Sequence, residues 1–246
     1  MNEIDLHVHT SASRCGLHSL LEVLAHARGL GMRCVAITDH DDEPAAAVRV
    51  LSYRFPREWE GLRVLAGIEL GIRDGGRIRI PHPVKLRDLD ICLAGFHANS
   101  RERNDLEAEE LTDELEYALA HYPFIDVISH PTIRGFALEP ERTARLAARH
   151  GAALEVNNCS LRYGKEEPER VLALLDAARR HGCLVAIDSD AHTVAELGGD
   201  EKARPLVEQA GIPAERIVNR SLEAVVEFVE ARRRFKRAAP VRGEGA

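Results

Sequence analysis

The sequence predicts a single α/β domain built on a mostly parallel sheet. Its 246 residues suffice for one large core of α/β-barrel size and are few for two ordinary domains. Short apolar runs rich in β-branched residues alternate with helical patterns along the chain. This alternation fits a closed α/β barrel, and an open doubly wound sheet shares it. We expect the domain to span residues 1–237, followed by a flexible tail at 238–246.

The strands are expected where the apolar runs are short and bounded by turn residues. Most of them are separated by a stretch long enough for one helix, as parallel strands require. In chain order, the expected strands are 4–8, 34–38, 64–70, 91–96, 125–129, 153–156, 184–187 and 217–218.

Capping residues mark the helices between these strands. Ser19 stands three residues before Glu22, which predicts a capping box, and Gly29 and Gly31 end the helix that follows. Proline in a first turn and glycine after a last turn mark the later helices in the same way. These are expected from Pro140 to the His150–Gly151 pair, from Glu167 to Gly182, and after Ser221.

Composition narrows the class of protein. No apolar run approaches the roughly 18 residues of a membrane span, and the first residues do not resemble a signal peptide, so a cytoplasmic location without membrane partners is expected. The five cysteines are odd in number and lack CxxC spacing, which predicts free thiols. A formal charge of −7 and an aromatic content of 4% disfavour long nucleic acid, and the basic run at 232–237 is expected to be a solvated helix end.

Twelve histidines are the unusual feature of the composition, and half of them lie at the ends of expected strands. Strand alternation places His7 and His9 on one side, where two imidazoles can bind one metal ion. The carboxyl ends of barrel strands meet at one rim, so the side chains there are expected to share a site. These candidate ligands are His7, His9, His40, Glu69, His97, His130, Asp190 and His192.

The segments that carry these side chains resemble a known family. HVHT, TDH, GIE, GFH, SHP and SDAH occur in the order typical of the PHP (polymerase and histidinol phosphatase) superfamily, and their spacing is most similar to its YcdX-like phosphatase branch. The resemblance extends from Asp5 to His192 and includes LEVNN at 154–158. It implies a distorted (β/α)7 TIM-like barrel with a trinuclear metal centre that hydrolyses phosphate esters.

The resemblance also assigns the ligands of three divalent ions. It implies a first metal held by His7, His9, Glu69 and Asp190, a second that shares Glu69 and adds His97 and His130, and a third held by His40 and His192. The family supplies one more histidine to the third metal, and Cys15 stands at that position here, with His18 or water as the alternative. Thiolate favours zinc, with manganese and iron the other possibilities.

The activity implied is hydrolysis of small-molecule phosphate monoesters by a hydroxide that bridges two metals, with catalytic roles for Glu69, Asp190 and His192. Asp39 and Asn157 are candidates for orienting the ligands. Basic residues of the expected loops are the candidates for contacting the phosphate, and these are Arg14, Arg134, Arg162 and Lys165.

Three other functions remain open at this point. One is a phosphodiesterase that acts on small nucleotides or nucleic-acid ends, another is a non-catalytic PHP scaffold, and the third is a different metal-dependent hydrolysis on an amidohydrolase-like barrel. Substrate choice is expected to depend on the loops at 41–61 and 74–89. The sequence leaves the substrate, the metals and the oligomeric state open.

Overall fold

The structure is a computed structural model that describes residues 1–41, 55–80 and 85–238. Parts of the two expected specificity loops lie outside the described residues, as does the segment 239–246 of the expected tail. The last helix runs to Ala238, so the boundary between domain and tail stays a prediction.

The parallel strands follow one another around the sheet in chain order. That order is β1 (Ile4–Val8), β2 (Cys34–Ile37), β4 (Leu62–Arg73), β6 (Ile91–Gly95), β7 (Val127–Ile128), β8 (Ala153–Asn157) and β9 (Leu184–Asp188). The first and last strands come together just past their ends, where Val8 bridges Ala191 and the His9 N–H donates to the Ala191 carbonyl at 2.9 Å. The sheet is therefore nearly closed into a TIM-like barrel. The strand order also excludes a doubly wound sheet, in which the order would reverse partway along the chain.

The helices begin and end where capping chemistry predicts. Ser19 and Glu22 form the expected capping box of the first helix, and Gly151 and Gly182 end two later helices in the left-handed region, with φ of 64° and 63°. The described α-helices are α1 (Leu20–Gly29), α3 (Ala108–His121), α4 (Pro140–His150), α5 (Asn158–Arg162), α6 (Pro168–His181), α7 (Ala203–Gln209) and α8 (Leu222–Ala238). Short 3₁₀ turns are η1 (Asp74–Gly76), η2 (Leu86–Asp88), η3 (Ala98–Ser100), η4 (Val194–Glu196) and η5 (Ala214–Arg216).

The expected strand at 217–218 is wrong. Ile217 makes an isolated bridge to Val185, and the chain enters this region from the 3₁₀ turn η5. The Asn219 side chain then takes the place of a strand backbone: its Oδ1 accepts from the Ile187 N–H at 3.1 Å and its Nδ2 donates to the Ile187 carbonyl at 2.6 Å. A side-chain amide therefore satisfies the peptide groups that an additional strand would have paired.

Strand β4 is longer than expected and connects the barrel to a hairpin. It pairs with β2 over residues 63–66 and with β6 over 67–71, so it crosses from one neighbour to the other. Gly67 lies at the crossing, where a Cβ would approach the Thr38 side chain to 2.7 Å. Beyond this point β4 pairs antiparallel with β5 (Arg77–Ile78), while β3 (Glu58–Trp59) pairs with its beginning. Strand β4 thus extends past the barrel rim.

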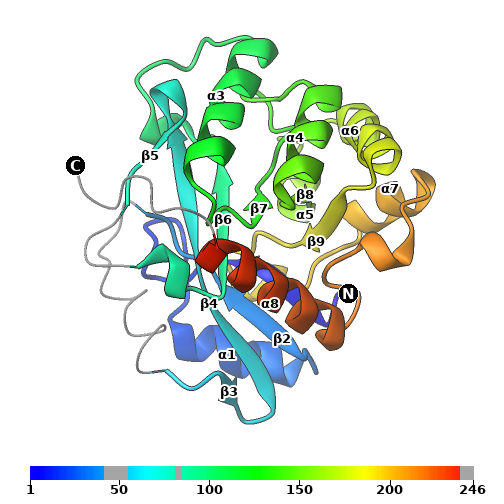
Figure 1. The fold of residues 1–246 in the computed structure, drawn as a ribbon. Helices are drawn as coiled ribbons and strands as arrows, with labels where there is room; N and C mark the ends of the chain where they lie inside the picture. The colour runs from blue at the N-terminus through cyan, green and yellow to red at the C-terminus, as the bar shows by residue number, and fades with distance from the viewer. Residues whose placement is uncertain (42–54, 81–84, 239–246) are drawn as a thin grey trace.

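The barrel interior is apolar and is closed at one end by α8. Alternate strand residues, such as Ile4, Leu6 and Leu65, form one buried cluster with Val225 and Phe228 of α8. Helix α8 lies across this end of the barrel (Figure 1). Polar side chains occupy the opposite end of the barrel, where the parallel strands finish.

Buried charges also attach α8 to the barrel. Asp126 accepts hydrogen bonds from Arg232 Nε at 2.8 Å and Lys236 Nζ at 2.5 Å, and also from the Cys92 N–H at 2.9 Å. Lys236 is only 1% exposed. The basic run at 232–237 is therefore not simply a solvated helix end, because two of its cations neutralise a carboxylate inside the protein.

Replacing Asp126 with alanine should leave two buried cations without their partner. We expect a loss of about 3–5 kcal/mol in the free energy of unfolding, measured by urea denaturation. The matched control is Asp113→Ala, which removes an exposed carboxylate that pairs with Arg142 at 2.7 Å. It should change stability by less than about 1 kcal/mol, and equal losses in the two variants would contradict the proposed attachment of α8.

Candidate metal centre

A β-bulge in β1 turns two histidines toward the barrel mouth. In the register with β2, Asp5 pairs with Val35 and Val8 with Ile37, so two β1 residues stand opposite one β2 residue. Leu6 therefore stays in the interior cluster while the next residue, His7, also turns inward. His9 resumes the alternation, and the Nε2 atoms of His7 and His9 lie 3.1 Å apart. The expected juxtaposition of the two imidazoles is present.

Glu69 lies at the centre of the site. Its Oε1 is 2.8 Å from His130 Nε2 and 3.1 Å from His97 Nε2, and its Oε2 is 3.0 Å from His40 Nδ1 and 3.3 Å from His7 Nε2. The carboxylate is 1% exposed. Residues from the ends of several strands thus converge on one buried carboxylate, as expected from the barrel topology.

Two of the candidate ligands have positive φ angles, which non-glycine residues seldom adopt. His130 has φ of 33° and Asp190 has φ of 57°. At His130 the unusual backbone lets both Ser129 and His130 reach Glu69, with the Ser129 hydroxyl donating at 3.0 Å. Gly95 leaves the space they need, because a Cβ there would lie 2.4 Å from Ser129 Oγ and 2.6 Å from the His130 ring.

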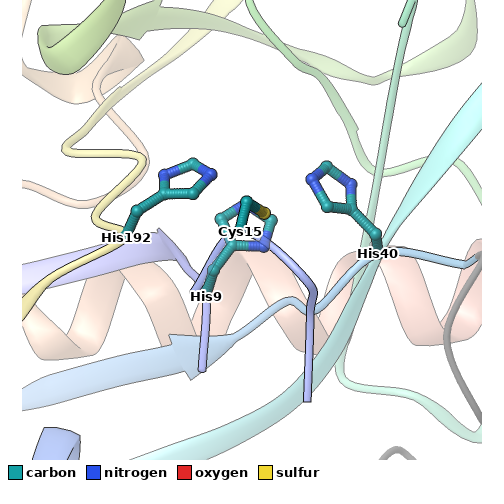
Figure 2. A group of neighbouring side chains, drawn as sticks. All are labelled: His9, Cys15, His40 and His192. Atoms are coloured by element: carbon teal, nitrogen blue, oxygen red, sulfur yellow. The ribbon is translucent and has the colours of Figure 1, made fainter. Parts of the chain in front are cut away.

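A second group of donors lies beside Glu69. One ligand atom from each of His9, Cys15, His40 and His192 lies within 4.8 Å of the others. Figure 2 shows the rings of His192 and His40 on either side of Cys15 and His9. His18, the alternative to Cys15, instead accepts a hydrogen bond from the Val194 N–H at 3.4 Å and belongs to none of the described donor groups.

The donor set fits divalent cations. Glu155 Oε1 lies 2.6 Å from His7 Nδ1, which places the proton of a neutral ring on that nitrogen. The His7 Nε2 lone pair then faces Glu69 Oε2 at 3.3 Å and Asp190 Oδ1 at 3.4 Å. Acceptors that face one another at such distances repel unless positive charge lies between them. Imidazole, carboxylate and thiolate are together the ligand types that zinc prefers.

The pKa shifts show the same demand for positive charge. Burial opposes protonation of His40, but the charge of Glu69 and the hydrogen bond to Cys15 raise its pKa to about 11. Burial likewise opposes protonation of His192, and contacts with Cys15 and Asp190 raise its pKa to about 9. The surrounding imidazoles outweigh burial at Glu69 and hold its pKa well below the ordinary value. Protons and metal ions would therefore compete for the same nitrogen atoms.

A layer of buried polar residues supports these side chains. Sequence reasoning missed Glu155, which holds His7 Nδ1 and also accepts from the His130 N–H at 2.7 Å. Asn157 donates to Glu155 at 3.1 Å and to Asp190 at 3.1 Å. The signal that could have located Glu155 was its place in LEVNN, two residues before Asn157, on the inward side of an expected strand.

The other candidate orienting residue, Asp39, shapes the loop that leads to Cys15. Its carboxylate accepts from the Thr10 N–H and from the Ser13 hydroxyl, each at 2.7 Å. The Ser13 hydroxyl in turn accepts from the His40 N–H at 3.0 Å. One buried carboxylate therefore links the loop to the strand end that carries His40.

An open cavity of about 350 Å³ is lined by seven of the nine candidate ligands, all except His7 and His9, and by two of the four predicted phosphate contacts. Arg14 and Lys165 line the cavity, together with Asn99 and Ser160, which sequence reasoning missed. Arg134 and Arg162 do not line it, and each lies 3.8 Å from a glutamate, as Arg134 does from Glu167 and Arg162 from Glu201. The structure thus brings two of the four basic candidates to the donors.

Comparison with known proteins establishes the family. A PHP domain matches residues 5–164. The chain is 35% identical over 241 residues to a probable phosphatase of Shewanella frigidimarina, with 93% of each chain covered. It is 34% identical over 239 residues to a probable phosphatase of Enterobacter sp., with 94% of this chain and 95% of that one covered. The chain belongs to the PHP family.

Solved structures share the fold. Histidinol phosphate phosphatase from Lactococcus lactis, complexed with zinc, L-histidinol and phosphate, aligns with a TM-score of 0.59 at 16% identity over 85% of this chain and 94% of that one. A chain of an archaeal ribonuclease P complex aligns with a TM-score of 0.55 at 17% identity over 97% and 95%. Across the described part of the chain, no helix is both long and apolar enough to cross a membrane.

The thiol of Cys15 should be reactive in metal-free protein. Although burial raises its pKa, hydrogen bonds from His192 and His40 outweigh burial and lower the pKa to about 6. Its alkylation by iodoacetamide should therefore accelerate as the pH rises through about 6 and level off by about pH 8, as followed by mass spectrometry.

Zinc should slow that alkylation if Cys15 is a ligand. Cys34 and Cys92 provide internal controls, because burial raises the pKa of each to about 12. Equal alkylation rates with and without zinc would contradict ligation by the Cys15 thiolate.

Replacing Glu155 with glutamine should weaken metal binding without removing a ligand. The amide keeps the shape of the side chain but loses the charge that holds His7 Nδ1–H at 2.6 Å. We expect zinc affinity to fall by roughly 10–100-fold in competition with a chelating dye. Glu58→Gln, a change at an exposed residue of β3, is the control, and unchanged affinity in Glu155→Gln would refute the orienting role.

Proposed function

We propose that this protein is a metal-dependent phosphatase that hydrolyses small-molecule phosphate monoesters at a trinuclear centre. The observation that carries the proposal is the convergence of carboxylate, imidazole and thiolate donors in overlapping groups around Glu69. The similarity to probable phosphatases over 93% of the chain supports the reaction class. A cytoplasmic setting is part of the proposal, because all five cysteines are free thiols, which a reducing compartment preserves.

The donor groups suggest how three cations would be shared. His7, His9, Glu69 and Asp190 would hold the first, and Glu69 would also contact the second with His97 and His130. Cys15, His40 and His192 would hold the third, with His9 beside them. The thiolate favours zinc over manganese or iron. Bound divalent cations would neutralise the charge of a phosphate dianion and lower the pKa of water to near neutrality.

The protein's own residues would position the substrate. Arg14 and Lys165 line the same cavity as the donors and would pair with phosphate oxygens. Glu155 and Asn157 would keep His7 and Asp190 in place throughout turnover. Their burial and mutual hydrogen bonds limit rearrangement, so the site needs little reorganisation when a phosphate enters.

Purified protein loaded with zinc should bind nearly three equivalents and hydrolyse p-nitrophenyl phosphate. Glu69→Gln should lower turnover by at least about 100-fold and reduce the metal content, because one carboxylate contacts two of the donor groups. Metal content is measured by plasma mass spectrometry and turnover by p-nitrophenolate release.

Glu109→Gln is the matched control, because Glu109 lies on the exposed side of α3. Full activity and metal content in Glu69→Gln would contradict the bridging role of Glu69. Faster cleavage of bis-p-nitrophenyl phosphate than of the monoester would identify a phosphodiesterase. A chain that binds metal and cleaves neither compound under zinc, manganese or iron would be a scaffold.

A further inference from the structure

A second cavity adjoins the candidate metal centre, and its lining contains additional arginines. It measures about 260 Å³ and shares Arg14, His40, His97 and Asn99 with the larger cavity. Its remaining wall contains Arg73 and Arg79. A molecule whose phosphate lies at the donor groups could therefore extend into this second cavity without leaving the protein.

The hairpin of β4 and β5 carries Arg73 and Arg79 beyond the rim of the barrel. Glu69, Gly71 and Arg73 are alternate residues of one strand and so face the same side. A strand rises about 3.3 Å per residue, which places the Cα of Arg73 about 13 Å beyond that of Glu69. The register of β4 with β5 pairs Ile72 with Ile78, so Arg79 follows opposite Gly71. Both arginines thus stand above the metal centre on one hairpin.

The hairpin is fixed to the rest of the protein. Arg101 Nη2 lies 3.1 Å from Asp74, and its Nη1 donates to Glu114 of α3 at 2.7 Å. The Gly75 N–H donates to Glu114 at 2.8 Å, and a Cβ on Gly76 would lie 2.3 Å from the Glu114 carbonyl oxygen. These contacts dock the turn closely on α3. The hairpin that carries the two arginines is therefore held in place by α3.

Arg73 lines the second cavity, and its guanidinium makes only long contacts with the described residues. Its Nη1 donates to the Ser100 carbonyl at 3.4 Å and its Nη2 lies 3.7 Å from Asp41, which are both long contacts. Its buried Nε has no hydrogen-bond partner among the described residues. Among the described residues that line the cavity, Arg14, Arg73 and Arg79 face one carboxylate, Asp41, so this part of the lining has an excess of positive charge.

We propose that this second cavity binds a second anionic group of the substrate, through Arg73 and Arg79. The inference rests on the proposed phosphatase function and defines its substrate class: a phosphate monoester that also carries a phosphate or carboxylate a few bonds away. Guanidinium groups recognise both anions by charge-assisted hydrogen bonds. The second anion then selects the substrate, while the phosphate at the donor groups is hydrolysed.

A series of matched substrates tests the proposal in the zinc-loaded protein. Butyl phosphate has no second anion, 4-phosphonooxybutanoate adds a carboxylate, and 1,4-butanediol bisphosphate adds a phosphate. We expect kcat/KM for at least one of the two compounds with a second anion to exceed that for butyl phosphate by about 10–100-fold. The larger gain identifies whether carboxylate or phosphate is the preferred second anion. Homologues with three to six carbons measure the spacing.

The double variant Arg73→Gln/Arg79→Gln should reduce that preference to about twofold or less, mainly through KM. Arg77→Gln is the matched control, because it removes a cation from the same hairpin at an exposed position that does not line the cavity. It should keep the preference. No preference in the wild type, or equal loss in the control variant, would overturn the second anion site.

Calorimetry separates this proposal from the phosphatase function. Binding of 1,4-butanediol bisphosphate and 4-phosphonooxybutanoate is measured for the wild type and both variants. Binding that is lost in the double variant alone, in a protein that hydrolyses no phosphate ester, would retain the anion site and reject the phosphatase. Hydrolysis without any preference would retain the phosphatase function and reject the anion site. Absence of both binding and hydrolysis would reject the anion site and the phosphatase function together.

Discussion

The buried carboxylate of Glu69 requires positive charge around it, and the upper half of the barrel is organised to supply that charge. Imidazoles of His7, His40, His97 and His130 lie within 3.3 Å of its oxygens. Burying a carboxylate costs several kcal/mol unless cations or hydrogen bonds compensate. A neutral His7, whose Nδ1 proton faces Glu155, would oppose its Nε2 lone pair to the carboxylate, so a proton or a metal ion must lie between them. The unusual backbone at His130 and Asp190 is consistent with this constraint, since both residues are held where their side chains reach the group.

Closure of the barrel brings the parts of this group together. His7 and Asp190 are separated by most of the chain, yet their ligand atoms lie 3.4 Å apart because Ala191 pairs with the end of β1. At the other end, Asp126 ties α8 to the base of the barrel through buried cations. Apolar side chains thus pack at the base of the barrel and stabilise the fold, while the polar candidate ligands gather at its mouth.

Local patterns predicted much of this architecture, and the failures have physical causes. The Ser19 capping box and the glycines after α4 and α6 depend on a few neighbouring residues, so they were predictable. The burial of Lys236 was not predictable, because its carboxylate partner, Asp126, is 110 residues away in the sequence. The length of β4 also depended on a partner, since its last residues, Ile72 and Arg73, pair with Ile78 and Arg77 of β5.

The sequence by itself determined the order of the seven parallel strands, the family and the candidate ligands, because these follow from local spacing and motif. Tertiary structure decided which basic residues face the donors: Arg14 and Lys165 line the cavity, while Arg134 and Arg162 lie outside it. It also revealed Glu155 beneath His7 and the arginine pair above Glu69. The reason is common to all of these: the direction of a side chain depends on bulges, on register and on strand extension, which are fixed only when distant segments pair.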